Sequence, residues 1–318
     1  MIEFYKPSLQ ELWFREELLN DEATMAYNHH WGGTIPFPRE IWARWYKRWF
    51  NVDETVRYYR YILDTDINKF VGEVSYHYEE QRAIYLMDVI VKAEYRFQGI
   101  GTTALRMLIE VAKENGLSIL HDDIAKDNLA VELFRSEGFY EDYSSEYTVM
   151  LKKPVAVFDS ERLYFTRLSR EYLDDYLNMI NDYENVGSMI GKNKEIITRD
   201  QEIRFIQNKL ENKDKVFSMI DKSDCCFVGN IEFMRFDTDS AYLGIAVTAA
   251  KQNMGFGKEG INRFLKYGHE AYGLNEVFLD VYKKNPRAMH VYEECGFEVI
   301  SETDNQYKMK KNLRQLTA

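Results

Sequence analysis

The feature that most constrains the fold of this chain is a glycine turn that occurs twice. The first copy is Arg96-Phe-Gln-Gly-Ile-Gly101 and the second is Gln252-Asn-Met-Gly-Phe-Gly257. Each copy follows a short apolar, β-branched segment and precedes a helical run, so both predict a strand, a tight turn and a helix. Because Gly99 and Gly255 lie 156 residues apart, the two copies indicate an internal repeat.

A second pair of markers supports the repeat. Gly138-Phe139 and Gly296-Phe297 lie 158 residues apart, and each follows a predicted strand and short helix. Two nearly equal offsets predict that the chain is two copies of one unit. Lys152-Lys-Pro154 is the predicted linker. We therefore expect an N-terminal domain over residues 1–153, with an aromatic-rich insert, and a C-terminal domain over 154–318.

Composition narrows the class of protein. The 318 residues suffice for two domains with their own cores, and the balance of 45% hydrophobic and 29% charged residues is typical of a globular protein. The net charge of −11 argues against binding to nucleic acid, because phosphate contacts need a basic surface. There is no run of 18 apolar residues and no basic, apolar leader at Met1, so neither a membrane span nor a secretory signal is predicted.

The cysteines and histidines do not predict a metal site. Cys225 and Cys226 are neighbours, an awkward arrangement for a disulfide, and Cys295 stands alone. We expect reduced thiols and a cytoplasmic protein. His29 and His30 lie on a predicted loop with no carboxylate or cysteine at ligand spacing, so no metal is predicted there. A contact with substrate is the alternative role for them.

Hydrophobic periodicity predicts similar elements in both copies. In the first copy it predicts strands over 2–5, 56–63, 69–78, 83–91, 117–123 and 143–151, and helices over 9–20, 39–50, 102–115 and 127–137. In the second it predicts strands over 163–168, 216–220, 226–236, 240–247, 276–282, 298–301 and 306–310, and helices over 170–182, 199–210, 258–272 and 285–295. The expected fold class is α+β, with a mixed six- or seven-stranded sheet flanked by helices in each domain.

An aromatic stripe leaves two interpretations open. Trp42, Trp45 and Trp49 are spaced to share one face of the predicted helix over 39–50. The stripe fits ordinary core packing. It also fits an aromatic wall over a substrate pocket, continued by Trp31 and Phe37.

Together these motifs resemble those of the GNAT superfamily of acyl-CoA-dependent N-acyltransferases. The glycine turns match the pattern [RQ]-x-x-G-x-[GA]. The segment Asn285-Pro-Arg-Ala-Met-His-Val-Tyr-Glu-Glu-Cys-Gly-Phe297 matches N-x-x-A-x-x-x-Y-x-x-x-G-F in full. Because the resemblance covers both halves, the chain resembles a tandem GNAT protein, with acetyl-CoA as the implied acyl donor.

The resemblance implies a CoA-binding site in each half. Outward-pointing N–H groups of a glycine turn at a helix N-terminus form an anion site, which would bind the pyrophosphate. The pantetheine arm would pair beside the preceding strand. The implied contacts in the first half are Ile90, Val91, Arg96, Gln98, Gly99, Ile100, Gly101, Thr102, Asn128 and Phe134. In the second half they are Ala246, Val247, Gln252, Met254, Gly255, Phe256, Gly257, Lys258, Asn285, Ala288 and Tyr292.

The resemblance also implies a general acid. The family often uses a tyrosine of the short helix to protonate the departing thiolate, and Tyr292 holds that position in the second half. The first half departs from the pattern, with Phe134 in place of the tyrosine and Asp127 in place of Asn285. This difference favours the second half as the catalytic one, although the reverse assignment stays open.

The general base is not assigned to one residue. The family takes it from the strands that precede the glycine turn, where Glu73 and Asp88 are candidates in the first half and Glu232 in the second. Asp122 and Asp280 occupy equivalent positions 158 residues apart, so Asp280 is a further candidate.

The predicted function is transfer of an acetyl group from acetyl-CoA to a primary amine by direct attack. The amine could belong to a small molecule or a peptide, and the protein could be a monomer or a homodimer. The alternative is a non-catalytic acyl-CoA-binding or interaction protein with degenerate domains. A third hypothesis, an aminoacyl transferase that uses charged tRNA, is disfavoured by the net charge of −11.

Overall fold

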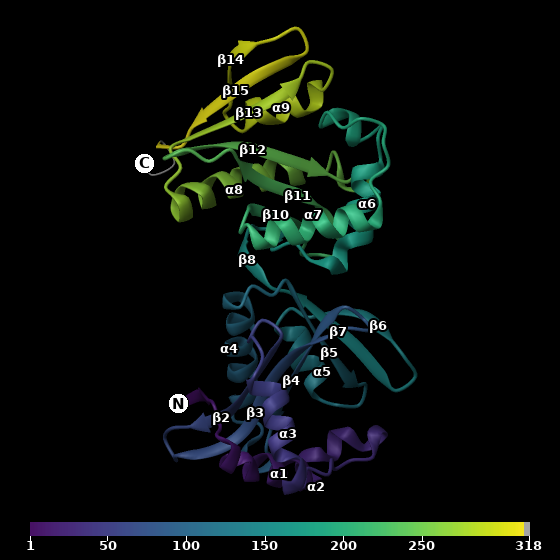
Figure 1. Cartoon of the computed structure of the whole chain (residues 1–318), viewed down its shortest axis with the longest axis vertical. Helices are drawn as coiled ribbons and strands as arrows, with labels where there is room; N and C mark the ends of the chain where they lie inside the picture. The colour runs from purple at the N-terminus through teal and green to yellow at the C-terminus, as the bar shows by residue number, and fades with distance from the viewer. Residues whose placement is uncertain (315–318) are drawn as a thin grey trace. The chain divides into compact units, whose positions relative to one another are not determined.

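The computed structural model of the chain describes residues 1–314. The chain divides between Val155 and Ala156 into two compact units. Each unit is a mixed sheet with flanking helices, which confirms the predicted α+β class (Figure 1). Within the described residues no helix is both long enough and apolar enough to cross a membrane.

The first unit is built on a seven-stranded sheet in the order β1-β2-β3-β4-β5-β7-β6, in which only β4 and β5 run parallel. The strands are β1 (Ile2–Tyr5), β2 (Arg57–Asp64), β3 (Lys69–Glu79), β4 (Ile84–Val91), β5 (Ile119–Ala125), β6 (Tyr140–Ser144) and β7 (Thr148–Pro154). The helices are η1 (Leu9–Leu12), α1 (Trp13–Asn20), α2 (Glu22–Met25), η2 (Ala26–Trp31), α3 (Arg39–Phe50), η3 (Ala93–Tyr95), α4 (Ile100–Glu114) and α5 (Ala130–Ser136).

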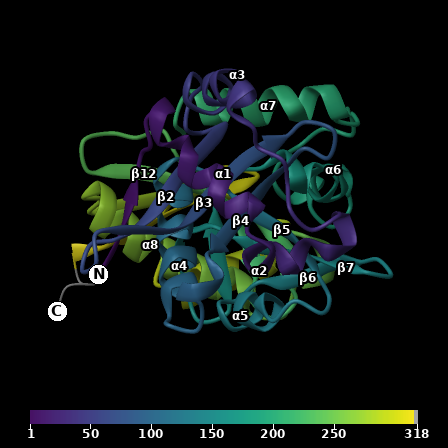
Figure 2. The same cartoon turned by 90° about the horizontal axis from the view of Figure 1, so that it is seen from below.

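Both faces of this sheet are covered. Figure 2 shows α4 and α5 on one side of the strands and α1 and α3 on the other. Side chains alternate between the faces along a strand. Tyr58 of β2 therefore packs in the cluster under α4, whereas Tyr59 packs with Phe14 of α1. The tryptophan stripe of α3 belongs to this second layer, since Trp42 is buried and Trp45 packs on Tyr59. Core packing is thus the interpretation that the structure favours.

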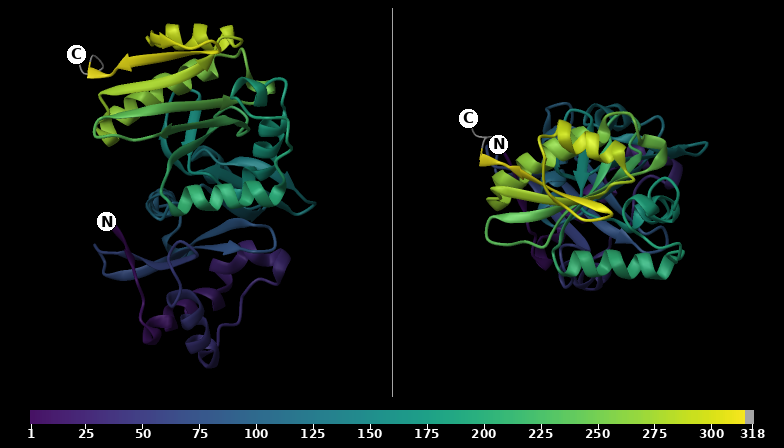
Figure 3. Two further views of the ribbon diagram at one scale, coloured as in Figure 1. Left: turned by 45° about the horizontal axis from the view of Figure 1, so that its top comes forward. Right: turned by 90° about the horizontal axis from the view of Figure 1, so that it is seen from above.

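The second unit repeats the plan with eight strands, one more than expected, in the order β14-β15-β13-β12-β11-β10-β9-β8. The strands are β8 (Ala156–Asp159), β9 (Leu163–Thr166), β10 (Lys215–Asp221), β11 (Phe227–Met234), β12 (Ser240–Val247), β13 (Glu276–Tyr282), β14 (Glu298–Glu302) and β15 (Gln306–Asn312). The helices are η4 (Arg170–Tyr172), α6 (Leu173–Asn181), η5 (Gly187–Met189), α7 (Arg199–Glu211), η6 (Ala249–Lys251), α8 (Phe256–Tyr272) and α9 (Pro286–Glu294). Helices α8 and α9 lie on the face of the sheet opposite α7 (Figure 3).

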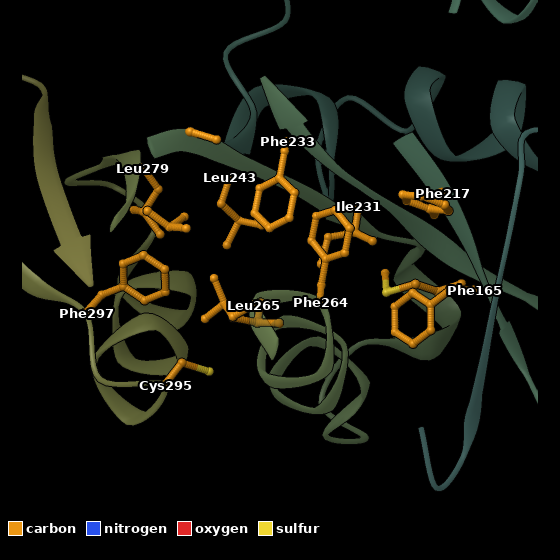
Figure 4. Close-up of a cluster of buried hydrophobic side chains, with 14 of the residues drawn as sticks. Phe165, Phe217, Ile231, Phe233, Leu243, Phe264, Leu265, Leu279, Cys295 and Phe297 are labelled. Carbon is orange, nitrogen blue, oxygen red and sulfur yellow. The ribbon is translucent and has the colours of Figure 1, made fainter. Parts of the chain in front are cut away.

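The core of the second unit lies between α8 and the sheet. Phe264 of α8 stacks on Phe233 of β11 with ring centroids 3.9 Å apart, and Leu265 and Leu243 fill the space beside them (Figure 4). All four side chains are almost fully buried. This packing holds the middle of α8 against the sheet, and the second glycine turn lies at the N-terminal end of the same helix.

Two predictions of local structure were wrong. Residues 143–151 form parts of two antiparallel strands, β6 and β7, rather than one strand. The expected linker, Lys152-Lys-Pro154, is instead the end of β7, where Pro154 pairs with Ile119. Proline is tolerated at a strand terminus because the missing N–H leaves few ladder bonds unmade there, so Pro154 did not mark a break.

Candidate functional site

Each glycine turn presents a row of backbone N–H groups. Gly99 and Gly255 both take the left-handed conformation, with φ of 79° and 82°, and so do Phe97 and Asn253 two residues earlier. Alternation of this kind turns successive N–H groups toward one side. Among residues 1–314, no hydrogen bond uses the N–H groups of residues 98–101 or 254–257. Each turn therefore offers an anion site at the start of a helix.

The first residue of each turn motif holds the preceding strand rather than pointing into solvent. Arg96 Nε donates to the carbonyl oxygen of Val91 at 3.0 Å, and Gln252 Nε2 donates to that of Val247 at 2.9 Å. Arg96 also reaches backbone oxygens of α2. In this arrangement the two side chains position the strand ends, and direct contact with a cofactor stays a prediction.

The two parallel strands of each sheet separate along the residues that lead up to the glycine turn. β4 and β5 pair only at Leu86 and His121, and β12 pairs with β13 only over Ser240–Tyr242. The later residues of β12, including Ala246 and Val247, line a cavity instead. An opening between two parallel strands can accept an extended ligand arm as an added strand. Ile90 and Val91 hold the equivalent positions in the first unit.

Two glycines make room at the same place in both units. A Cβ at Gly72 would lie 2.2 Å from the carbonyl oxygen of Ile90, and one at Gly229 would lie 2.0 Å from that of Ala246. Neither position tolerates a side chain without backbone movement. The close approach of β3 to β4, and of β11 to β12, is thus a shared feature of both openings.

The second unit contains a cavity of about 880 Å³ that joins the predicted parts of its site. It extends from the glycine turn past the separated strands to the carboxylates of β11 and β13. Of the predicted site residues, those that line it are Glu232, Ala246, Val247, Gln252, Gly255, Gly257, Lys258, Asp280, Asn285, Ala288 and Tyr292. Met254 and Phe256 belong to the turn but do not line the cavity. Phe256 is buried beneath the Arg162 guanidinium.

Tyr292, the predicted general acid, lies on the wall of this cavity. It lies on α9, half-buried, with its ring beside Phe297 and its side chain lining the cavity. Burial raises the pKa of Tyr292 to about 12, so its hydroxyl stays protonated at neutral pH. In the first unit Phe134 is buried against Phe139 in the core, and its ring has no proton to give.

The asparagines of the short helices act locally as caps. Asn285 Oδ1 accepts from the N–H of Ala288 at 3.1 Å and so begins α9. In the first unit the equivalent N–H group, that of Ala130, donates to a side chain one residue further along the chain. Its acceptor is Asn128 Oδ1, at 2.9 Å. Asp127, which aligns with Asn285, is thereby left out of the cap.

At one equivalent place of the two sheets, each unit has a carboxylate, but the two carboxylates come from different strands. Ser75 of β3 lies opposite Asp88 of β4, and in the same place of the second unit Glu232 of β11 lies opposite Gly244 of β12. Gly244 leaves space that Glu232 uses, since a Cβ there would lie 3.2 Å from Glu232 Cγ. Each unit thus has one carboxylate from this cross-strand pair and a second on the next strand, Asp122 or Asp280.

In the first unit this pair of carboxylates is perturbed. Asp88 is still solvent-exposed, but the surrounding side chains desolvate its carboxyl enough to raise its pKa, and desolvation together with the charge of Asp88 raises the pKa of the half-buried Asp122 well above its usual range. Tyr27 of η2 is near both, and its pKa is raised by burial and by their charges. The separated strands of the first unit therefore contain an acidic site.

The predicted base Glu73 is bound on both oxygens. Arg15 of α1 and the hydroxyl of Tyr59 each hydrogen-bond it. The Arg15 guanidinium lies over the rings of Phe37 and Trp45, 5.1 and 4.7 Å from their centroids. These contacts favour a structural role for Glu73 and leave little room for proton transfer.

The acidic side chains of the second unit differ in their partners. Glu232 Oε2 accepts from Lys209 Nζ at 2.9 Å, and Asp280 lies 3.9 Å from Arg235. Glu202 of α7 was missed by the sequence analysis, although it lines the same cavity, is only 8% exposed and has a pKa raised by burial. Glu202 lies four residues before the buried Ile206, so the two share one face of α7, and this spacing could have indicated that Glu202 is buried.

Comparisons with known proteins assign a family to each unit. A model described as "Acetyltransferase (GNAT) family" matches residues 16–139, and one described as "Acetyltransferase (GNAT) domain" matches 162–298.

Two curated proteins match short stretches of the chain. A stretch of 58 residues is 41% identical to spermidine N(1)-acetyltransferase of Vibrio cholerae, covering 18% of this chain and 34% of that protein. A stretch of 65 residues is 40% identical to thialysine N-epsilon-acetyltransferase of Bos taurus, covering 20% and 38%. The matches thus span little more than a third of these relatives.

Two solved structures are similar to part of the chain. One is a spermidine N-acetyltransferase from Vibrio cholerae in complex with CoA and spermine, at TM-score 0.46 and 23% identity, covering 50% of this chain and all of that one. The other is a GNAT-family acetyltransferase from Bacillus anthracis, at TM-score 0.45 and 18% identity, covering 48% and 96%.

Proposed function

The chain belongs to the GNAT acetyltransferase superfamily in both of its units, and from this premise we propose that it transfers an acetyl group from acetyl-CoA to a primary amine. The cavity of the second unit carries the proposal. It brings a vacant N–H row, separated strands, a protonated tyrosine and several carboxylates into one space of about 880 Å³.

The residues of the second unit fit acetyl-CoA as donor. The N–H groups of residues 254–257 have no acceptor among the described residues and suit a pyrophosphate. Ala246 and Val247 line the opening that would take the pantetheine arm. Bound there, acetyl-CoA supplies an activated thioester carbonyl.

The chain's own groups would handle the protons of the reaction. An amine nitrogen forms a bond to the thioester carbonyl carbon, the carbon–sulfur bond breaks, and the sulfur leaves as a thiolate. Three carboxylates line the cavity: Glu202, Glu232 and Asp280. One of them would take the proton that the ammonium must lose. Tyr292 would return a proton to the sulfur. Glu202 is the base candidate we favour, because it lines the cavity, makes no ion pair among the described residues that would compete for its charge, and has a pKa raised by burial.

The acceptor we propose is an amine on an aliphatic chain. The curated relatives are named for spermidine and thialysine, which are both such amines. The carboxylates of the cavity would attract a cationic amine, and apolar side chains such as Met179 and Phe205 would contact its methylenes.

The first unit is proposed to bind the same donor without an equivalent acid. Its glycine turn has the same vacant N–H groups, but Phe134 is buried in the core. The alternative, a chain that binds acyl-CoA without catalysis, is separated from this proposal by the test below.

The test is calorimetric titration of the whole chain with acetyl-CoA, using Gly101→Glu and Gly257→Glu. Neither glycine has a left-handed φ, and a Cβ at each would meet only valine or leucine methyl groups at 3.7 Å or beyond. An acidic residue in the first helical turn also suits the helix dipole, so both variants should fold.

We expect two binding sites in the wild type, one of which is lost in each variant, and spermidine acetylation lost only with Gly257→Glu. Loss of acetylation with Gly101→Glu alone would move catalysis to the first unit. Binding without turnover of spermidine, lysine or other aliphatic amines would support the non-catalytic alternative. Absence of any acetyl-CoA binding would refute the proposed function.

A further inference from the structure

We propose that the first unit holds a divalent transition-metal ion between His29, His30 and Asp127. The two histidines lie on η2 and the aspartate lies after β5, far away in the sequence. Asp127 Oδ2 is 3.2 Å from His29 Nε2 and 3.9 Å from His30 Nε2, and one donor atom from each residue lies within 4.8 Å of the other two. Ligand atoms around tetrahedral zinc are roughly 3.3 Å apart, by bond lengths of about 2.0–2.1 Å.

The hydrogen bonding of His29 supports a cation at this position. His29 Nδ1 lies 3.1 Å from the carbonyl oxygen of Ala26, which can only accept, so Nδ1 carries the proton. In the neutral ring Nε2 then has a lone pair, and that lone pair faces a carboxylate oxygen. Two electron-rich atoms at this distance repel unless a proton or a metal ion lies between them, and the zinc titration distinguishes these two cases. A backbone carbonyl that fixes the tautomer is also the usual outer partner of a metal-bound histidine.

The ligand set selects the kind of metal. Two imidazoles and one carboxylate suit zinc, nickel or copper, whereas magnesium and calcium prefer oxygen ligands. All three side chains are solvent-accessible, so water can complete the coordination. Zinc is therefore the probe of choice and magnesium the matched negative control.

The departure of the first unit from the repeat agrees with this role. Asp127 occupies the position of Asn285, which caps α9 in the second unit. In the first unit the cap is made by Asn128, so the carboxylate of Asp127 is released from the helix and faces the two imidazoles. No carboxylate stands at ligand spacing from these histidines along the chain, and it is the fold that brings Asp127 to them from a distant segment.

A metal here would fix η2 against the segment between β5 and α5. Tyr27 lies on the same short helix and is near Asp88 and Asp122 in the opening between β4 and β5. The ion would thereby hold Tyr27 over the acidic site of the first unit. This inference does not depend on the proposed acetyl transfer.

The test is zinc titration of the untagged full-length chain at pH 8, above the usual titration range of histidine. The variants are His29→Ala, His30→Ala and Asp127→Asn. His290→Ala is the matched control, because His290 lies 3.8 Å from Glu294 in a surface pair that has no second imidazole. Cobalt gives a second readout, since its ion should quench Trp31, whose ring lies 6.4 Å from that of His30.

We expect one zinc ion per chain, no magnesium binding, and an affinity at least tenfold weaker in each of the three variants. His290→Ala should bind as the wild type does. Cobalt should quench fluorescence in the wild type and not in Asp127→Asn. No zinc binding by the wild type, or binding that the three variants leave unchanged, would overturn the proposal and leave an imidazolium–carboxylate pair as the explanation.

Discussion

At the scale of single residues, the two units differ most clearly in one aromatic side chain of their short helices, Tyr292 of α9 and Phe134 of α5. Tyr292 lines the cavity of the second unit, whereas Phe134 is buried in the core of the first. Because the pKa of Tyr292 is raised to about 12, the phenol is protonated at every pH near neutrality. In the proposed reaction it would therefore act as an acid rather than as a base.

Replacing this hydroxyl tests its role. We expect Tyr292→Phe to lower kcat for amine acetylation by about 10²-fold, the usual contribution of a general acid. The KM for acetyl-CoA should change little, since the ring remains. Phe134→Tyr in the first unit is the reciprocal variant and should not raise the rate. Steady-state kinetics that show an unchanged kcat for Tyr292→Phe would remove the tyrosine from the mechanism.

A second residue-scale prediction concerns Asp122. Its pKa is raised by burial and by Asp88, so the folded state binds a proton more tightly than the unfolded chain does. The stabilisation is complete below the ordinary aspartate pKa of about 3.9 and is lost as the pH rises through the folded pKa. At pH 7 Asp122 is therefore expected to destabilise the first unit.

Asp122→Asn should raise the free energy of unfolding at pH 7 by about 0.5–2 kcal/mol, a common gain for relief of one unfavourable group. The gain should shrink as the pH is lowered toward 4. Urea unfolding at both pH values measures it, with Glu110→Gln as a surface control whose ion pair with Lys113, at 3.9 Å, is weak. Destabilisation by Asp122→Asn at pH 7 would show that the ionised Asp122 carboxylate stabilises the first unit, contrary to this prediction.

The sequence predicted some of these residues and could not predict others. Gly99, Gly255 and Tyr292 stand in motifs whose spacing is local, so the turns were found directly. That Asp88 and Glu232 hold equivalent places could not be predicted, because it depends on which residues face each other across neighbouring strands. This register is set by the turns and by the buried faces of the strands. Glu202 depends on the packing of α7, and the His29–Asp127 contact joins distant segments.

At the scale of elements, Arg15 and Glu73 join α1 to the centre of the first sheet. Their ion pair is buried, and Tyr59 of β2 completes it. Removal of one partner leaves an unpaired charge in the interior, which commonly costs about 3–5 kcal/mol. The ion pair as a whole contributes less than this to the free energy of unfolding, because an apolar pair of similar size would avoid the cost of removing two charges from water.

We therefore expect Glu73→Leu to destabilise the first unit by about 3–5 kcal/mol, and Arg15→Met with Glu73→Leu to recover most of that loss. Urea unfolding followed by tryptophan fluorescence measures both, since Trp45 lies against the Arg15 guanidinium. If Glu73 were the base instead, Glu73→Gln would abolish turnover while leaving the unfolding midpoint in place.

Elements with strong periodicity were predicted within a few residues. The helix over 39–50 and the strand over 276–282 were placed at the observed ends. The β6–β7 hairpin was missed because its turn contains no glycine or proline, only polar residues from Ser145 to Tyr147. Strand β8 was missed because it directly follows the segment interpreted as a linker.

At the scale of the whole molecule, the tryptophans are unevenly distributed. All five, Trp13, Trp31, Trp42, Trp45 and Trp49, lie in the first unit. Each unit has its own hydrophobic core, under α4 in the first and under α8 in the second. Tryptophan fluorescence therefore reports the unfolding of the first unit alone, whereas circular dichroism reports both.

Two equivalent substitutions use this asymmetry. In Gly72→Ala and Gly229→Ala the new Cβ would lie 2.2 Å and 2.0 Å from a backbone oxygen, so each should destabilise its own unit by at least about 1–3 kcal/mol. Gly72→Ala should move the fluorescence midpoint in urea. Gly229→Ala should leave that midpoint unchanged and shift only part of the circular dichroism transition.

Gly101→Ala is the matched control for the first unit, since its nearest neighbours would be 3.7 Å away and alanine favours the helix that contains it. Its fluorescence midpoint should stay in place or rise. If Gly229→Ala moved the fluorescence midpoint as far as Gly72→Ala does, the two cores would unfold as one cooperative unit. The chain would then have to be treated as a single domain in energetic terms, despite its two separate hydrophobic cores.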